Sequence, residues 1–153
     1  MNSAIPRSLS ALCALAACLC GSPLVAAEAK AVKLEVTLVW GTNEAESPNP
    51  EHKPVCAEVA KKLEELPFHW KYYFEVKRRQ VTVPEGGTQK VILSKDCQIV
   101  VKNLGKTVVA MDLIGKGESV TTIKKRLPKG EVLVTGGNAP NFTAWFVVLK
   151  QAE

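Results

Sequence analysis

Residues 89–135, QKVILSKDCQIVVKNLGKTVVAMDLIGKGESVTTIKKRLPKGEVLVT, decide the fold, because short apolar runs alternate in this stretch with residues that form turns. Glycine, proline, asparagine and aspartate separate the runs, and tight reversals of the chain need these residue types. The pattern predicts strands at residues 89–93, 97–102, 107–114, 119–127 and 131–135. Strands spaced this regularly are typical of an antiparallel β-sandwich or a partly open barrel. We therefore expect a mainly β protein.

Three further extended segments lie around this stretch. Apolar and polar residues alternate over residues 32–40, which is the period of a strand with one buried face. Residues 68–83 also have an extended pattern, and the alternation breaks at residues 78–79, where we expect a β-bulge. The last run, residues 142–149, is apolar on both faces and predicts a central strand that the helix or a second sheet covers.

One amphipathic helix is expected in the chain. Apolar side chains recur on one helical face over residues 54–66, and charged side chains occupy the other faces. Pro54 can lie in the first turn, where its missing N–H costs nothing, and Pro67 should end the helix. Residues 41–53 contain prolines, asparagines and acidic residues, so we expect an exposed loop before the helix.

The first 27 residues have the layout of a secretory signal peptide. Arg7 is the only charged residue there, and the apolar run at residues 9–20 is shorter than the roughly 20 residues that span a bilayer. Small residues precede Ala27, after which we expect cleavage. Residues 28–153 have the length of one domain, so we predict a single β-rich domain that is exported, either periplasmic or secreted.

An alternative reading of the same segment is a lipoprotein signal. Residues 15–18, LAAC, resemble the site at which bacterial lipoproteins are cut and acylated on the cysteine. The exported protein would then be anchored to a membrane by a lipid on Cys18.

The cysteines are consistent with export. Three of the five lie in the predicted signal, which leaves Cys56 and Cys97 as a pair in a compartment where disulfides persist. We predict a disulfide between them, which would close a loop of roughly 42 residues and stabilise the fold by about 4 kcal/mol. The alternative is two unpaired, buried thiols.

The residues suited to catalysis are few. The chain has two histidines, and the sequence contains no nucleophile elbow, zinc-protease motif or phosphate-binding loop. His52 and Cys56 are four residues apart, but Pro54 lies between them and weakens any metal or nucleophile pair. We expect no catalytic residue, cofactor or metal site. His69 is interpreted as a packing residue.

We predict a non-enzymatic secreted or cell-envelope module with a binding or structural role. The chain has a net charge of +5 and short basic runs at residues 77–79 and 124–126. In an exported protein these features favour an envelope polysaccharide, an anionic polymer or another envelope protein as partner. We expect neither nucleic-acid binding nor a transmembrane segment. A more specific hypothesis is a carbohydrate or polyanion site on Trp70 and Tyr72, since aromatic faces stack on sugar rings. A small extracytoplasmic enzyme is the remaining alternative.

Three runs carry a resemblance to known sequences: LVWGTN at residues 38–43, YYFEV at residues 72–76 and TAWFVVL at residues 143–149. With these runs the chain resembles uncharacterised small exported proteins of planctomycete-type and related bacteria. The resemblance implies an extracytoplasmic setting and assigns no catalytic or binding residues.

Overall fold

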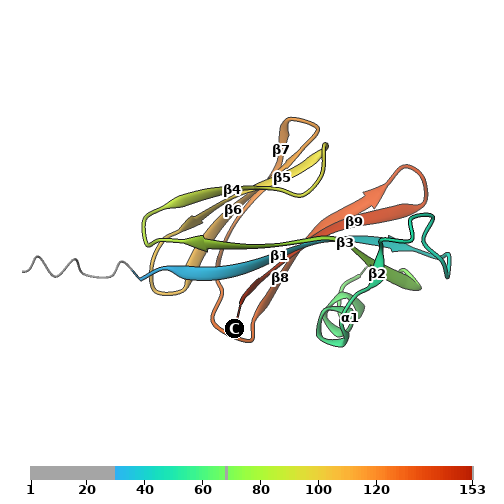
Figure 1. Cartoon of the computed structure of the whole chain (residues 1–153), viewed down its shortest axis with the longest axis horizontal. Coiled ribbons are helices and arrows are strands. Elements are labelled where there is room, and N and C mark those ends of the chain that lie inside the picture. Colours follow the sequence, from blue (N-terminus) through green and yellow to red (C-terminus); the bar gives the residue numbers. More distant parts are fainter. Residues whose placement is uncertain (1–29, 68, 153) are drawn as a thin grey trace, which may run out of the picture.

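The computed structural model describes residues 30–67 and 69–152, which form two antiparallel sheets and one short helix (Figure 1). The first sheet has the order β2 (Lys53–Pro54), β3 (Tyr72–Val83), β1 (Val32–Thr42), β9 (Thr143–Gln151), β8 (Val132–Ala139). The second sheet has the order β4 (Thr88–Ile92), β5 (Cys97–Asn103), β6 (Val108–Gly115), β7 (Glu118–Arg126). This confirms the predicted mainly β, sandwich-like fold. Neither sheet closes into a barrel within the described residues.

The structure has three layers. Figure 1 shows the second sheet on one side of the first sheet and helix α1 (Ala57–Glu64) on the other. The main core lies between the two sheets and includes Leu34, Ile99, Met111 and Leu149, all fully buried. A second, smaller core lies between the first sheet and the helix and includes Val59, Leu63 and Phe146.

Strands β1 and β9 lie in the interior of the first sheet, with β1 at its centre, and for much of their length the second sheet covers one face and the helix-side core the other. In β9, Val147 and Leu149 face the second sheet, whereas Phe146 and Val148 face the helix. The prediction of a central last strand is therefore confirmed. In β1 the same placement also buries Glu35, at a position where alternation alone predicts an exposed residue. Ion pairs with Arg78 and Lys150 compensate the cost of burying the negative charge of this carboxylate.

Two β-bulges interrupt the ladders. In the β1–β3 pair, Leu38 pairs with Lys77 and Val39 with Glu75, which leaves Val76 as the extra residue. The break expected at residues 78–79 therefore occurs slightly earlier in β3. In the β6–β7 pair, Leu113 pairs with Thr121 and Ile114 with Ser119, which leaves Val120 as the extra residue.

The helix is shorter than predicted. It covers Ala57–Glu64, because Lys53 and Pro54 form the short strand β2 that pairs with β3. A residue before proline is pushed toward extended backbone, which favours this pairing over a helical turn. The described segment 69–71 likewise precedes β3 and is not part of it. No helix of the described residues is long and apolar enough to cross a membrane.

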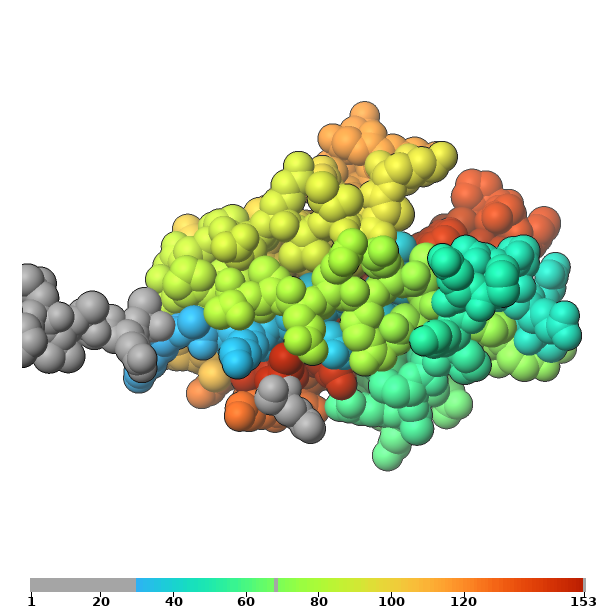
Figure 2. All heavy atoms as spheres, viewed as in Figure 1, coloured from blue at the N-terminus to red at the C-terminus, as the bar shows by residue number. Residues whose placement is uncertain are grey.

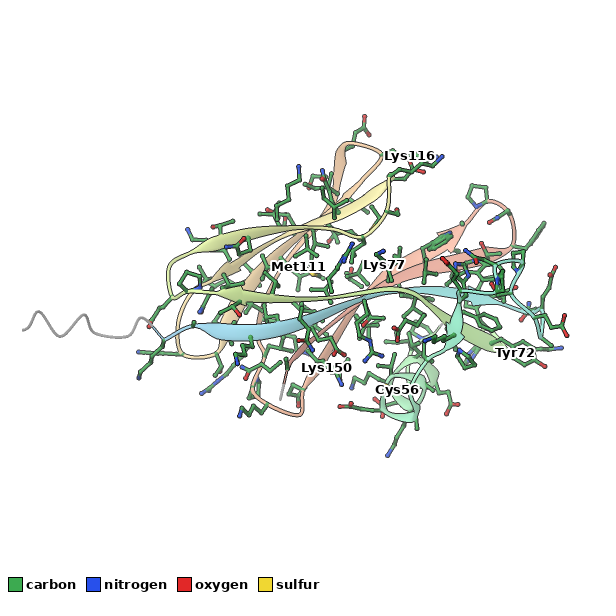
Figure 3. All side chains as sticks on the ribbon, in the orientation of Figure 1. Cys56, Tyr72, Lys77, Met111, Lys116 and Lys150 are labelled. Atoms are coloured by element: carbon green, nitrogen blue, oxygen red, sulfur yellow. The ribbon has the colours of Figure 1, made fainter. Side chains whose placement is uncertain are left out.

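The predicted disulfide is not formed, because Cys56 and Cys97 are both free thiols. Cys56 immediately precedes α1, next to the helix-side core, whereas Cys97 begins β5 and packs against the core between the sheets. Figure 3 shows Cys56 beside the helix, on the side of the first sheet away from the second. The first sheet therefore separates the two thiols. The predicted signal peptide, residues 1–27, and the alternative lipidation site Cys18 lie outside the described residues.

Candidate functional site

An apolar cleft of about 860 Å³ lies between the ends of the two sheets. One wall belongs to the first sheet and includes Leu38, Trp145 and Val147, and the other belongs to the second sheet and includes Leu113 and Val120. Figure 2 shows the hollow between the yellow and orange atoms of the second sheet and the red atoms of the β8–β9 hairpin. Only part of each sheet is covered by the other at this end of the molecule.

The lip of the cleft on the second sheet is formed by two turns that are hydrogen-bonded to each other. The backbone N–H of Lys116, in the β6–β7 turn, donates to the carbonyl oxygen of Asp96, in the β4–β5 turn, over 2.8 Å. Both residues line the cleft. A lip held by a backbone hydrogen bond between two hairpins gives the cleft one fixed wall.

The opposite lip is the β8–β9 hairpin, whose backbone is unusually close-packed. Gly136 has a φ of +145°, and a Cβ at this position would overlap the carbonyl oxygen of Trp145. Only glycine allows this approach of β8 to β9. At the tip of the hairpin Phe142 has a φ of 55° and is 87% exposed, a rare combination for an aromatic residue. Beside it, Asn141 lines the cleft.

An aromatic row continues from the cleft across the first sheet. Trp145 pairs with Trp40 across the β9–β1 ladder, and Trp40 pairs with Phe74 across the β1–β3 ladder. Ring centroids are 6.4 Å apart in the first pair and 6.0 Å in the second, and His52 meets Trp40 edge-on at 6.3 Å. Of these aromatic rings, Trp145 is the one that lines the cleft and has a large exposed fraction.

One bulge places a side chain in the cleft, and the other places a lysine beside a residue of its wall. Because Val120 is the extra residue of β7, it lies out of the ladder and lines the cleft, where it is 63% exposed. The bulge at Val76 has a similar effect in β3, since it pairs Lys77 directly with Leu38, a residue of the cleft wall. Directly paired residues share a face of the sheet. Figure 3 shows Lys77 on the side of β3 toward the second sheet.

The charge around the cleft is predominantly positive. Lys95 and Lys116 line it, and Lys77 is the cross-strand partner of Leu38, a residue of its wall. All three lysines are exposed, and none makes an ion pair with a described residue. Asp96 is the one acidic side chain among the residues that line the cleft.

Cys97 lies in the cleft as a half-buried thiol. Burial raises the pKa of this thiol, because the surrounding apolar groups disfavour the thiolate. The thiol of Cys97 is therefore a weak nucleophile at neutral pH. Because it lines the cleft, its rate of alkylation should depend on whether a ligand occupies the cleft.

The two residues predicted to bind a ligand, Trp70 and Tyr72, do not share a surface. Trp70 packs on the helix side of the first sheet, where a Cβ on Gly41 would lie 3.2 Å from its ring. Tyr72 pairs with Thr42 and, by strand alternation, lies on the opposite face, the face of Trp40. The side chain of Tyr72 is 41% exposed.

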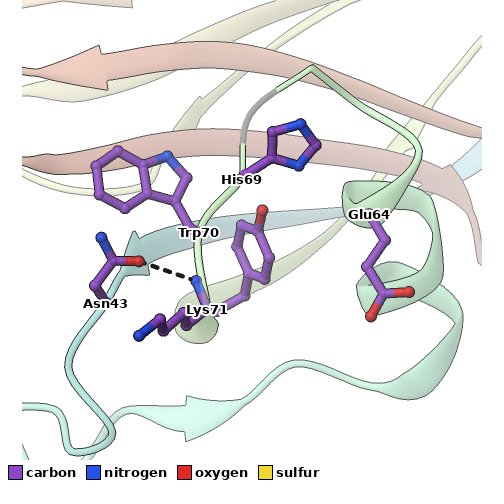
Figure 4. Close-up of a pocket in the computed structure, with 6 residues that line it drawn as sticks. Asn43, Glu64, His69, Trp70 and Lys71 are labelled. Carbon is purple, nitrogen blue, oxygen red and sulfur yellow. Dashed lines mark hydrogen bonds between the residues drawn. The ribbon is translucent and has the colours of Figure 1, made fainter.

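Trp70 instead lines a hollow of about 550 Å³ beside the helix, together with Glu64, His69 and Tyr73 (Figure 4). The Lys71 N–H donates to the Asn43 side-chain oxygen over 3.3 Å and holds the segment against the end of β1. His69 makes no hydrogen bond with Glu64 although both line the hollow.

The second histidine has a local partner. His52 Nδ1 shares a hydrogen bond of 2.7 Å with the Ser47 hydroxyl, within the loop before β2. Within residues 30–67 and 69–152 neither histidine hydrogen-bonds a carboxylate, and no cluster of histidine, cysteine and acidic residues could hold a metal ion. The pair His52 and Cys56 therefore forms no metal site among these residues.

A polar depression of about 440 Å³ lies on the helix-side face of the first sheet. Glu35 forms ion pairs there with Arg78 at 3.5 Å and Lys150 at 3.7 Å, and Lys150 also pairs with Glu58 of the helix at 3.1 Å. Arg78 additionally pairs with Glu75. These contacts link β3, β1, β9 and α1, so we interpret the network as structural.

Comparisons with known proteins identify no relative. No family model matches the chain, and no curated protein or solved structure matches it. The geometry of the cleft is therefore the main source of a functional argument.

Proposed function

We propose that this chain is an exported, non-enzymatic binding module whose ligand site is the cleft between the two sheets. The observation that carries the proposal is the cleft itself, with about 860 Å³ between mainly apolar walls. Small-molecule sites in proteins typically have roughly 300–1,000 Å³ and combine apolar walls with a few polar groups.

The construction of the cleft supports this role. Val120 is an exposed apolar residue placed in the cleft by a bulge, and such bulges occur often beside functional sites. A glycine at position 136 costs conformational entropy on folding, but it allows β8 to approach β9 closely beside Trp145. Trp145 keeps a large apolar surface accessible in the same cleft. None of these three residues belongs to the core between the sheets.

A binding panel with matched variants tests the proposal. The full chain is presented to immobilised envelope glycans, polyanions and amphiphiles, alongside Val120→Glu and Ile92→Glu. Val120 and Ile92 are suitable as a pair because both belong to the second sheet and are 63% and 62% exposed, but only Val120 lines the cleft.

We expect binding to one of the three ligand classes that Val120→Glu weakens at least tenfold and Ile92→Glu leaves unchanged. Equal binding by the two variants would place the site elsewhere. Failure of the wild-type chain to bind any class would contradict the binding role itself.

A further inference from the structure

We infer that the ligand of the cleft is a single-chain anionic amphiphile, such as a free fatty acid, with its acyl chain between the sheets and its carboxylate near the lysines at the mouth. This inference rests on the proposed binding function and names the ligand class. Three properties of the described residues lead to it: the apolar walls, the position of the positive charge and the shape of the opening.

The apolar walls match an acyl chain. Leu38, Leu113 and Val147 offer no hydrogen-bonding side chain, so a sugar ring in this part of the cleft would lose its contacts with water without replacement. An acyl chain, in contrast, is stabilised by each CH₂ group that leaves water for the apolar walls. Trp145 and Val120 extend the apolar surface to the lips of the cleft, where both remain partly exposed.

The position of the charge matches an anionic head group. Lys95 and Lys116 stand on the lip formed by the second sheet, and Lys77 stands on the first sheet beside Leu38. These ammonium groups make no ion pair with a described residue, so an incoming carboxylate would not have to displace an existing partner. Lysine suits this role as a mobile point charge on a long stem.

The two-walled shape favours one chain over a flat partner. The cleft lies between two separate sheets, and the Lys116–Asp96 backbone hydrogen bond fixes its outer lip. A linear polyanion needs positive charge along an exposed track, whereas Lys95 and Lys116 stand together on one lip of an apolar opening. The same geometry selects a ligand that combines an apolar part with one charged end.

Cys97 provides a direct readout of occupancy. It lines the cleft, whereas Cys56 is exposed beside the helix and outside the cleft. A ligand in the cleft should therefore slow alkylation of Cys97 by iodoacetamide and leave Cys56 unaffected. Peptide mass mapping measures the two rates separately in the same sample.

The experiment uses the full chain with four small probes: dodecanoate, dodecyl maltoside and dodecyltrimethylammonium, each below its micelle concentration, and acetate. The three amphiphiles have the same number of carbon atoms in their hydrocarbon chain and differ in head-group charge, and acetate is a carboxylate without a long chain. We expect dodecanoate to slow Cys97 alkylation at least fivefold at a concentration where the other three slow it less than twofold.

Variants separate the two halves of the site. Val120→Glu should remove protection by dodecanoate, and Ile92→Glu should retain it. The double variant Lys95→Gln, Lys116→Gln should weaken dodecanoate binding at least tenfold. The control Lys90→Gln, Lys124→Gln, on exposed lysines of the second sheet outside the cleft, should not.

Each other outcome overturns the inference. Equal protection by the neutral and cationic amphiphiles would remove the role of the lysines, and faster alkylation of Cys97 would mean that the probe unfolds the protein. A dimer in sedimentation analysis that Val120→Glu dissociates and dodecanoate does not would make a second copy the occupant. Protection of Cys97 by a glycan, but not by dodecanoate, would contradict this ligand class and leave the proposed binding function standing.

Discussion

The ring centroids of Trp40 and Trp145 lie 6.4 Å apart, because the two residues are direct partners on β1 and β9. Trp40 also contacts Phe74 and His52, so it is enclosed by rings on several sides. Trp145 is 40% exposed and forms part of the cleft wall. In this pair, Trp40 therefore contributes mainly to stability, whereas Trp145 is accessible to a ligand.

Alanine substitutions should separate these two roles. Trp40→Ala should lower the free energy of unfolding by about 3 kcal/mol, because it removes a largely enclosed ring. Trp145→Ala should cost about 1 kcal/mol, since much of its surface is already in water, yet it should weaken ligand binding more strongly than Trp40→Phe. Urea unfolding of the two alanine variants and of the double variant measures the free energies of unfolding. We expect a coupling energy of about 0.5–1.5 kcal/mol between the two rings. Equal losses for the two alanine variants would contradict the assignment.

Neighbouring glycines of β8 offer a second test. Gly136→Ala should destabilise the protein by about 2–4 kcal/mol, because a Cβ there overlaps the backbone of β9 and the φ of +145° is strained for alanine. Gly137→Ala is the matched control, since a Cβ at that position meets nothing within 4 Å. Its free energy of unfolding should stay within about 0.5 kcal/mol of wild type. Similar urea midpoints for the two variants would show that β8 and β9 are not this close.

Much of the fold is predictable from the sequence because turns and alternation are local signals. The strands expected at residues 89–93 and 97–102 are found within one residue at each end, and the last strand is central as expected. Helical periodicity locates α1 but not its start, because pairing of Lys53 and Pro54 with β3 depends on a strand distant in sequence.

The cleft is not predictable in the same way. It depends on the bulge at Val120 and on where the two sheets diverge, and no sequence motif marks Val120 or the lysine beside the cleft wall, Lys77. Trp70 and Tyr72 are prominent in the sequence, but the irregular segment 69–71 places them on opposite faces. In the sequence, the adjacent glycines Gly136 and Gly137 are the one indication that two strands approach closely near Trp145.

The ion-pair network around Glu35 should contribute to stability. Glu35→Gln keeps the shape of the side chain but leaves Arg78 and Lys150 without this partner, so we expect a loss of about 1–2 kcal/mol. Glu65→Gln, which removes the exposed pair with Lys62 on the helix, is the control and should produce no measurable change. Chemical denaturation of the two variants distinguishes a structural network from a set of surface contacts.

Alkaline pH should weaken the same network through Lys150. A hydrogen bond from Lys150 to Glu58 raises the pKa of this ammonium above its ordinary value of 10.5. A group whose pKa is raised by folding stabilises the protein fully below its unfolded pKa, and this contribution disappears as the pH rises through the folded pKa. Lys150→Met should therefore be less stable than wild type at pH 8, with the difference shrinking above the ordinary pKa of 10.5. A difference that is constant from pH 8 to 11 would argue against the pairing.

Processing of the N-terminus remains a prediction from the sequence. Cleavage after Ala27 would give a protein that starts at Glu28 without any lipid, whereas cleavage before Cys18 would give a longer chain with fatty-acyl groups on that cysteine. Intact mass spectrometry of the protein recovered from its native host separates the two species directly. We expect the mass of residues 28–153, and a diacylglyceryl mass on a chain beginning at Cys18 would replace this prediction by the lipoprotein alternative.

The two thiols of the described domain should differ in reactivity although neither is oxidised. Cys56 is exposed, whereas Cys97 is half-buried in the cleft with a pKa raised by burial, so at pH 8 both its accessibility and its thiolate fraction are reduced. We expect iodoacetamide to modify Cys56 at least tenfold faster than Cys97 in the native protein and at similar rates in 8 M urea. Peptide mapping without reductant supplies both rates. A peptide linking Cys56 to Cys97 would instead require the two sides of the first sheet to rearrange, and would restore the disulfide that the sequence predicts.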